Sequence, residues 1–134
     1  MKMVWPGDGA RPSGHYTPGV ISGGMLYISG QLPKDPGTGQ IPEGLEAQVR
    51  QALANVESIL KAAGAEKRDV VMCRLYIPDM AMWNSTDRIY AEFFGEHRPA
   101  RVVVPTRELH FGALIEIEAV AELPQNCGSE NTRR

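Results

Sequence analysis

Two segments of the chain repeat apolar residues at a spacing of three and four, the period of a helix that is buried along one face. In the first segment these positions are Leu45, Val49, Ala52, Leu53, Val56 and Leu60. Gly64 follows it, and glycine is typical of helix C-termini. In the second, over residues 80–96, the aligned positions are Trp83, Asp87, Tyr90 and Phe94. The pattern predicts two amphipathic helices, with Asp87 on the packed side of the second.

Runs rich in β-branched or alternating apolar residues predict strands. They cover residues 20–22, 25–29, 69–77, 100–107 and 113–123. Gly23 and Gly24 join the first two as a tight hairpin, because glycine tolerates the positive φ of such turns. In the last run, Glu116, Glu118 and Glu122 alternate with apolar residues, which predicts one buried and one polar face.

The resulting order is β-β-α-β-α-β-β, which indicates an α+β fold. A length of 134 residues fits one domain, predicted over residues 14–124. Residues 1–13, rich in glycine and proline, are predicted to form an irregular lead-in, and residues 125–134 a polar tail. Two amphipathic helices cover one face of a single sheet, so we expect another copy of the chain to cover the other face.

Charge and cysteine content narrow the classes of function. A net charge of −2 without a basic cluster argues against nucleic acid as a partner. Cys73 lies in an apolar run and Cys127 in the polar tail, which predicts no structural disulfide and favours a reducing compartment. With no apolar run long enough to span a bilayer and no signal-peptide core, we expect a cytoplasmic protein with no membrane partner.

Arg101 and Glu116 are the first candidates for chemistry. A hairpin of residues 100–107 and 113–123 would place both side chains on one face of the sheet. From spacing alone, a cross-strand salt bridge is the more frequent reason for such a pair. The functional alternative is a guanidinium that binds a substrate carboxylate beside a carboxylate that activates water.

Other candidate residues carry weaker local signals. Ser29 and Gly30 end a strand, where a site or a simple bulge is possible, and Tyr16 is either a core aromatic or a hydrogen-bonding residue above a site. Cys73 is predicted to be an inert packed thiol. The three histidines, His15, His97 and His110, have no neighbours at metal-ligand spacing, so we predict no metal.

Several runs resemble the YjgF/RidA family of imine deaminases. They are YISGQLP at 27–33, DPGTG at 35–39, QALANV at 51–56, AAG at 62–64, PAR at 99–101 and IEIEA at 115–119. These runs occur in the family's order from about residue 14 to residue 123. The resemblance implies a chorismate-mutase-like fold whose sheets pack into a barrel-like homotrimer with a cleft at each subunit interface.

The resemblance also implies a reaction: hydrolysis of 2-imino acids, formed from enamines such as 2-aminoacrylate, to 2-keto acids and ammonia, with no metal or organic cofactor. By position, Arg101 would bind the carboxylate and Glu116 would activate water. Tyr16, Ser29 and Gly30, together with the positions of Asp87 and Val103, would form the cleft. Such an imine is already electrophilic, so a held carboxylate and a positioned water are the main requirements.

Two positions differ from many members of the family. Val103 stands where they carry cysteine, and Asp87 stands where they carry asparagine. These differences leave a second hypothesis open, a trimer that binds a small carboxylate without turnover. A third reading, an RNA-acting translation inhibitor, fits the acidic composition poorly, because RNA affinity rests largely on neutralising phosphates.

Overall fold

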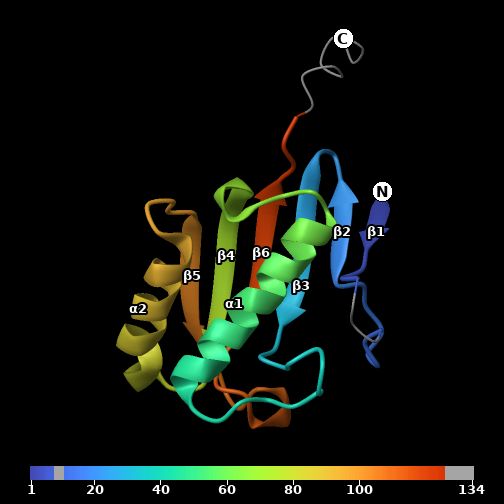
Figure 1. Ribbon diagram of the computed structural model, residues 1–134. Coiled ribbons are helices and arrows are strands. Elements are labelled where there is room, and N and C mark those ends of the chain that lie inside the picture. Colours follow the sequence, from blue (N-terminus) through green and yellow to red (C-terminus); the bar gives the residue numbers. More distant parts are fainter. Residues whose placement is uncertain (8–10, 126–134) are drawn as a thin grey trace.

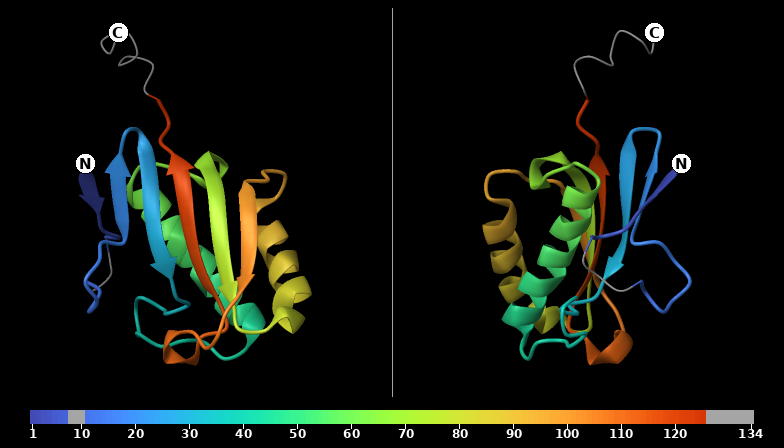
Figure 2. Two further views of the ribbon diagram at one scale, coloured as in Figure 1. Left: turned by 180° about the vertical axis from the view of Figure 1, so that it is seen from behind. Right: turned by 45° about the vertical axis from the view of Figure 1, so that its right-hand side comes forward.

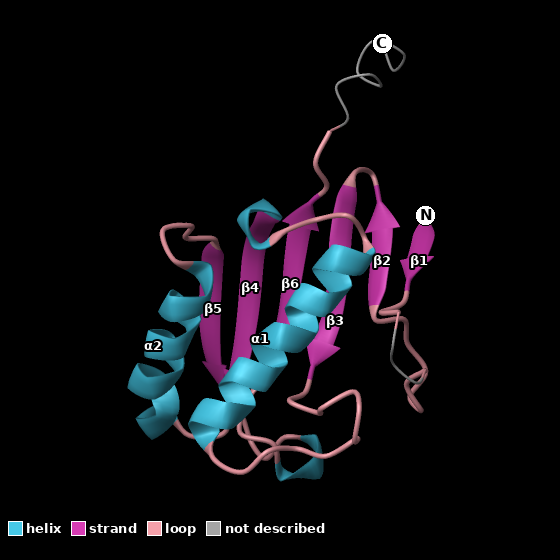
Figure 3. Cartoon of the chain, in the orientation of Figure 1, coloured by secondary structure: helices cyan, strands magenta, loops and turns pink. Residues whose placement is uncertain are grey.

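The computed structural model describes residues 1–7 and 11–125, which form one sheet with two α-helices on one of its faces (Figures 1 and 2). The strands are β1 (Lys2–Val4), β2 (Gly19–Ser22), β3 (Met25–Gln31), β4 (Val70–Ile77), β5 (Ala100–Pro105) and β6 (Glu116–Glu122). The helices are α1 (Leu45–Ala62) and α2 (Trp83–Phe94), and three short 3-10 turns occupy Lys67–Asp69, Met80–Met82 and His110–Gly112. The predicted α+β class is confirmed (Figure 3).

Both helices form where the apolar spacing predicts them. All six positions of the first apolar stripe except Leu45 are buried in α1, and Tyr90 and Phe94 are buried in α2. α2 begins at Trp83 rather than near residue 80, because a 3-10 turn precedes it and the Asp79 side chain accepts a hydrogen bond from the Ala81 backbone. The β2–β3 hairpin is also confirmed, with Ser22 opposite Met25.

The lead-in differs from its prediction. It contains a strand, β1, which pairs antiparallel with β2 and extends the sheet at one edge. Val4 at the end of β1 is 5% exposed and belongs to the hydrophobic core. Burial of Val4 stabilises this short strand although the residues after it are rich in glycine and proline. Most of the predicted tail, including Cys127, lies outside the described residues.

The sheet order is β1-β2-β3-β6-β4-β5, so β5 and β6 are not neighbours and the hairpin considered for them is wrong. β4 lies between them, parallel to β5 and antiparallel to β6. The reason is the connection through α2, because a helical crossover brings consecutive strands into parallel alignment. The chain between residues 106 and 115 then carries β6 past β4 to the centre of the sheet.

The two faces of the sheet differ in their cover. Cys73, Leu75 and Ile77 of β4 and Ile117, Ala119 and Ala121 of β6 are buried beneath the helices. On the face away from the helices, Tyr27 and Val102 are 48% and 42% exposed. We call this second side the open face; Figure 2 shows both helices on the other side.

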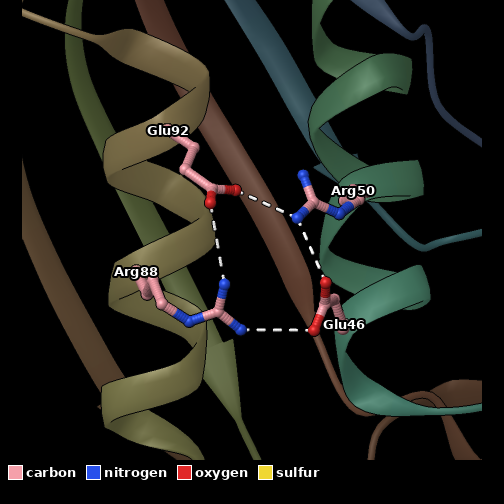
Figure 4. Close-up of polar contacts among 4 residues, drawn as sticks. All are labelled: Glu46, Arg50, Arg88 and Glu92. Atoms are coloured by element: carbon pink, nitrogen blue, oxygen red, sulfur yellow. Dashed lines mark hydrogen bonds and ion pairs between the residues drawn. The ribbon is translucent and has the colours of Figure 1, made fainter.

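A ring of four charged side chains joins the helices (Figure 4). Arg50 of α1 lies 3.1 Å from Glu46 and 3.0 Å from Glu92, and Arg88 of α2 lies 3.2 Å from Glu46 and 3.6 Å from Glu92. The two guanidinium groups lower the pKa of Glu46. The ring therefore links α1 and α2 through solvent-exposed ion pairs.

Neither helix in the described part of the chain combines the length and apolar character needed to cross a membrane.

Candidate active site

Arg101 is held against α2 by a carboxylate and two aromatic rings. Its Nη1 donates a hydrogen bond of 2.7 Å to Oδ1 of Asp87. The guanidinium carbon lies 4.9 Å from the ring centre of Tyr90 and 5.5 Å from that of Trp83, distances at which a cation is attracted to an aromatic ring. We call these four residues the Arg101 cluster. Its geometry fixes the guanidinium at the edge strand β5, where its side chain is 21% exposed.

Two buried groups that can titrate, Cys73 and Tyr90, lie beside Arg101. Cys73 lies opposite Arg101 in the β4–β5 ladder and is fully buried, and burial raises the pKa of its thiol. Burial also raises the pKa of the Tyr90 hydroxyl. Both groups therefore stay neutral at ordinary pH, and the predicted packing of Cys73 is confirmed. Val103 follows two residues later on the same face as Arg101, opposite the buried Leu75.

Glu116 begins β6 on the open face and packs against Gly30. A Cβ placed on Gly30 would lie 2.6 Å from Oε2 of Glu116, closer than atoms can approach. Ser29 precedes this glycine, at an irregularity in the β3–β6 ladder between Ile28 and Gln31. We call Ser29, Gly30 and Glu116 the Glu116 cluster. Only a residue without a side chain leaves the carboxylate in this position.

The environment of Glu116 shifts its protonation. Burial raises the pKa of its carboxyl above the ordinary value, and the charge of Glu118 raises it further, while the nearby His110 acts in the opposite direction. Glu118 itself accepts a hydrogen bond of 2.5 Å from the Tyr76 hydroxyl. A carboxylate with a raised pKa is a stronger base, which suits proton abstraction from water.

The segment that carries Tyr16 lies beside the Glu116 cluster. The Ser29 hydroxyl donates a hydrogen bond of 2.6 Å to the Thr17 carbonyl, and the Ser29 amide donates one of 2.9 Å to the Pro18 carbonyl. These bonds fix the chain just after Tyr16, whose side chain is 50% exposed. Tyr16 is therefore not a core aromatic residue.

Within one chain the two clusters lie on opposite faces of the sheet. Arg101 is opposite Cys73, which is opposite Ala119, and both of these partners are buried under the helices. Glu116 is opposite Tyr76, which belongs to the alternate set of β4 positions. Two strand spacings, about 10 Å, also separate β5 from β6. The cross-strand salt bridge between Arg101 and Glu116 is therefore wrong, and Arg101 pairs with Asp87 instead.

Sequence reasoning missed the groups that tune the candidate residues. Glu118 and Tyr76 meet across β6 and β4, and the strict alternation of glutamates marks only the face of Glu118. Asp87 could be found from its place on the packed side of α2, but nothing in the sequence indicated Arg101 as its partner. In residues 1–7 and 11–125, no three His, Cys, Asp or Glu side chains gather in a group that could hold a metal ion.

The chain is similar in sequence and in fold to known proteins. The model of the family described as Endoribonuclease L-PSP matches residues 8–123. A RutC family protein of Pyrococcus horikoshii is 40% identical over 90% of this chain and 96% of its own length. The 2-iminobutanoate/2-iminopropanoate deaminase of Escherichia coli K12 is 40% identical over 81% of this chain and 87% of its own. The crystal structure of E. coli TdcF with bound serine has a TM-score of 0.88 at 33% identity, covering 92% of this chain and all of that one.

Proposed function

Because this chain belongs to the endoribonuclease L-PSP family, the YjgF/RidA family that its sequence resembles, we propose that it hydrolyses reactive 2-imino acids to 2-keto acids and ammonia. The family includes 2-iminobutanoate/2-iminopropanoate deaminases 40% identical to this chain. One observation carries the proposal: the Glu116 carboxylate occupies space that is free only because residue 30 is glycine. Burial there raises the pKa of this carboxyl, which makes it a stronger base.

The proposed reaction needs three contributions from the protein. Arg101 binds the substrate carboxylate through its remaining N–H donors, which orients carbon 2 of the imine. Glu116 takes a proton from water as the oxygen attacks that carbon of the protonated imine, giving a neutral tetrahedral amino alcohol. Glu116 then gives this proton to the nitrogen, and takes the hydroxyl proton, which it releases to solvent, as ammonia leaves and the carbonyl forms. One water is consumed and one ammonia released for each keto acid.

The arrangement of the clusters supports a site between subunits, as in the homotrimer that the resemblance to the family implies. Arg101 and Glu116 of one chain point to opposite faces, so one chain alone cannot place both on the same small ligand. The open face also carries exposed Tyr27 and Val102, which a second copy would cover. We assign the site to the interface, where the Arg101 cluster of one copy meets the Glu116 cluster of the next.

Substitution of Arg101 tests the assignment. An amino-acid oxidase generates the imine, and keto-acid release is measured with and without the protein. Arg101→Ala should lower the acceleration about 100-fold or more, because hydrogen bonds to a charged carboxylate are lost, while the mass of the assembly stays the same. Arg68→Ala is the matched control, since Arg68 pairs with Glu66 at the surface and is 79% exposed. Equal rates for wild type and Arg101→Ala would show that the assignment is wrong.

A second candidate function is a trimer that binds a small carboxylate without turnover. Asp87 favours it, because this carboxylate already occupies one donor of Arg101. Saturable binding of a 2-keto acid, with no acceleration of ammonia release from any imine, would support binding over catalysis. RNA action is the weaker reading, since the chain has a net charge of −2.

A further inference from the structure

Asp87 changes the charge that a ligand meets at Arg101. The Asp87 side chain is 41% exposed and the Arg101 side chain 21% exposed, so the carboxylate lies nearer to the solvent than the guanidinium does. Among the described residues, each forms its only ion pair with the other. The pair is therefore neutral, and the incoming ligand meets a dipole rather than a free positive charge.

A bound carboxylate leaves this site with a net negative charge. Arg101 has five N–H donors, so it can hold Asp87 with one and a ligand carboxylate with others. Two carboxylates then share one guanidinium, and like charges in proximity are unfavourable. The second oxygen of Asp87 forms no hydrogen bond within the described part of the chain, which leaves it available to a donor on the ligand.

Within the same chain, the neighbouring cation Arg88 does not offset this negative charge. Arg88, the next residue of α2, pairs with Glu46 and Glu92 in the ring between the helices. The rings of Trp83 and Tyr90 lie beside Arg101, and aromatic faces attract cations. A positive group on the ligand would be attracted by both Asp87 and these rings.

We infer that the Asp87–Arg101 pair selects 2-imino acids with a positively charged side chain, of the ammonium or guanidinium class, over those with a neutral side chain. This inference rests on the proposed function, because it takes Arg101 as the group that binds the substrate carboxylate. Asp87 is its specificity-determining residue.

Binding of two keto acids of equal chain length tests the inference without requiring turnover. The probes are 5-guanidino-2-oxopentanoate, which carries a cation, and 2-oxopentanoate, which does not. Calorimetry should give the cationic keto acid a Kd about two- to fivefold lower, the upper part of the range for a partly exposed charge pair. High salt should reduce the ratio by screening. Asp87→Asn should remove the preference, chiefly by strengthening the binding of 2-oxopentanoate.

Two further variants separate selection from structural support. Asp87→Glu keeps the charge and should keep the preference. Glu92→Gln removes one negative charge from the same helix, at a residue that forms no ion pair with Arg101. This variant should also keep the preference for the cationic keto acid. No preference in the wild type, no binding of either keto acid, an Asp87→Asn variant that retains the preference, or one that weakens both keto acids equally would each overturn the inference.

Turnover measurements distinguish this inference from the proposed function. If the wild type prefers the cationic keto acid but accelerates no imine, the selection stands and the deaminase assignment fails. If it accelerates imines of neutral and basic amino acids with equal kcat/KM and Arg101→Ala abolishes both, the deaminase assignment stands and the selection fails.

Discussion

At Gly30, the addition of a single methyl group is expected to impair the proposed reaction. In Gly30→Ala the new methyl group overlaps Oε2 of Glu116, and the flexible end of that side chain must move. The free energy of unfolding should change by less than about 1 kcal/mol, because no backbone atom blocks the methyl group. Turnover should fall about 100-fold, the effect of misplacing a catalytic group by an ångström or so.

Two measurements check this expectation, thermal unfolding and imine hydrolysis. Gly7→Ala is the matched control, since a Cβ at Gly7 meets nothing within 4 Å. A Gly30→Ala protein with full turnover would show that the position of the Glu116 carboxylate is not needed.

Burial and, after it, the charge of Glu118 raise the pKa of Glu116, the proposed base. A base acts only when deprotonated, so activity should rise with pH through that raised pKa. Glu118→Gln removes the charge but can still accept the hydrogen bond from Tyr76. The acidic limb of kcat/KM against pH should then move to lower pH. Both proteins are measured on one substrate, so the titration of the substrate cancels; superimposable limbs would contradict the role of Glu118.

Among the elements, α1 and α2 are joined by the exposed ion pairs of the charged ring. Arg50 contacts glutamates of both helices, so Arg50→Gln should lower the melting temperature. The pairs are exposed, which makes the change small and sensitive to salt; it should shrink at 1 M salt, where charges are screened within about 3 Å. Arg68→Gln, which breaks a single surface pair with Glu66, is the comparison. A difference that persists at high salt would assign the effect to packing of the Arg50 stem instead.

The positions of helices and strands can be predicted from the sequence more directly than the order of strands in the sheet. A spacing of three and four locates α1, and alternation in β6 identifies which side chains are buried, since both patterns are local. Alternation does not indicate which strand is the neighbour in the sheet. The position of β4 between β5 and β6 could therefore not be predicted from it. Val4 shows the same limit for β1, because its burial depends on a core formed by residues distant in sequence.

In the complete fold, the residues of the candidate site were predicted from the sequence, but their positions relative to one another were not. The sequence singled out Arg101 and Glu116, and the structure brings Arg101 to Asp87 and Glu116 to Gly30. Their separation onto two faces depends on the strand order, a property of the complete sheet. Their roles in catalysis stay predictions.

Because Arg101 and Glu116 lie on opposite faces of the sheet, two inactive variants should complement each other in a mixed assembly. A chain lacking Arg101 still offers Glu116, and a chain lacking Glu116 still offers Arg101. Blending unfolded Arg101→Ala and Glu116→Gln chains and refolding them together should restore activity that neither has alone. In the proposed homotrimer, every mixed trimer holds one intact site of three, so an equal mixture should recover about a quarter of the wild-type rate. A blend as inactive as its parents would show that each chain works by itself.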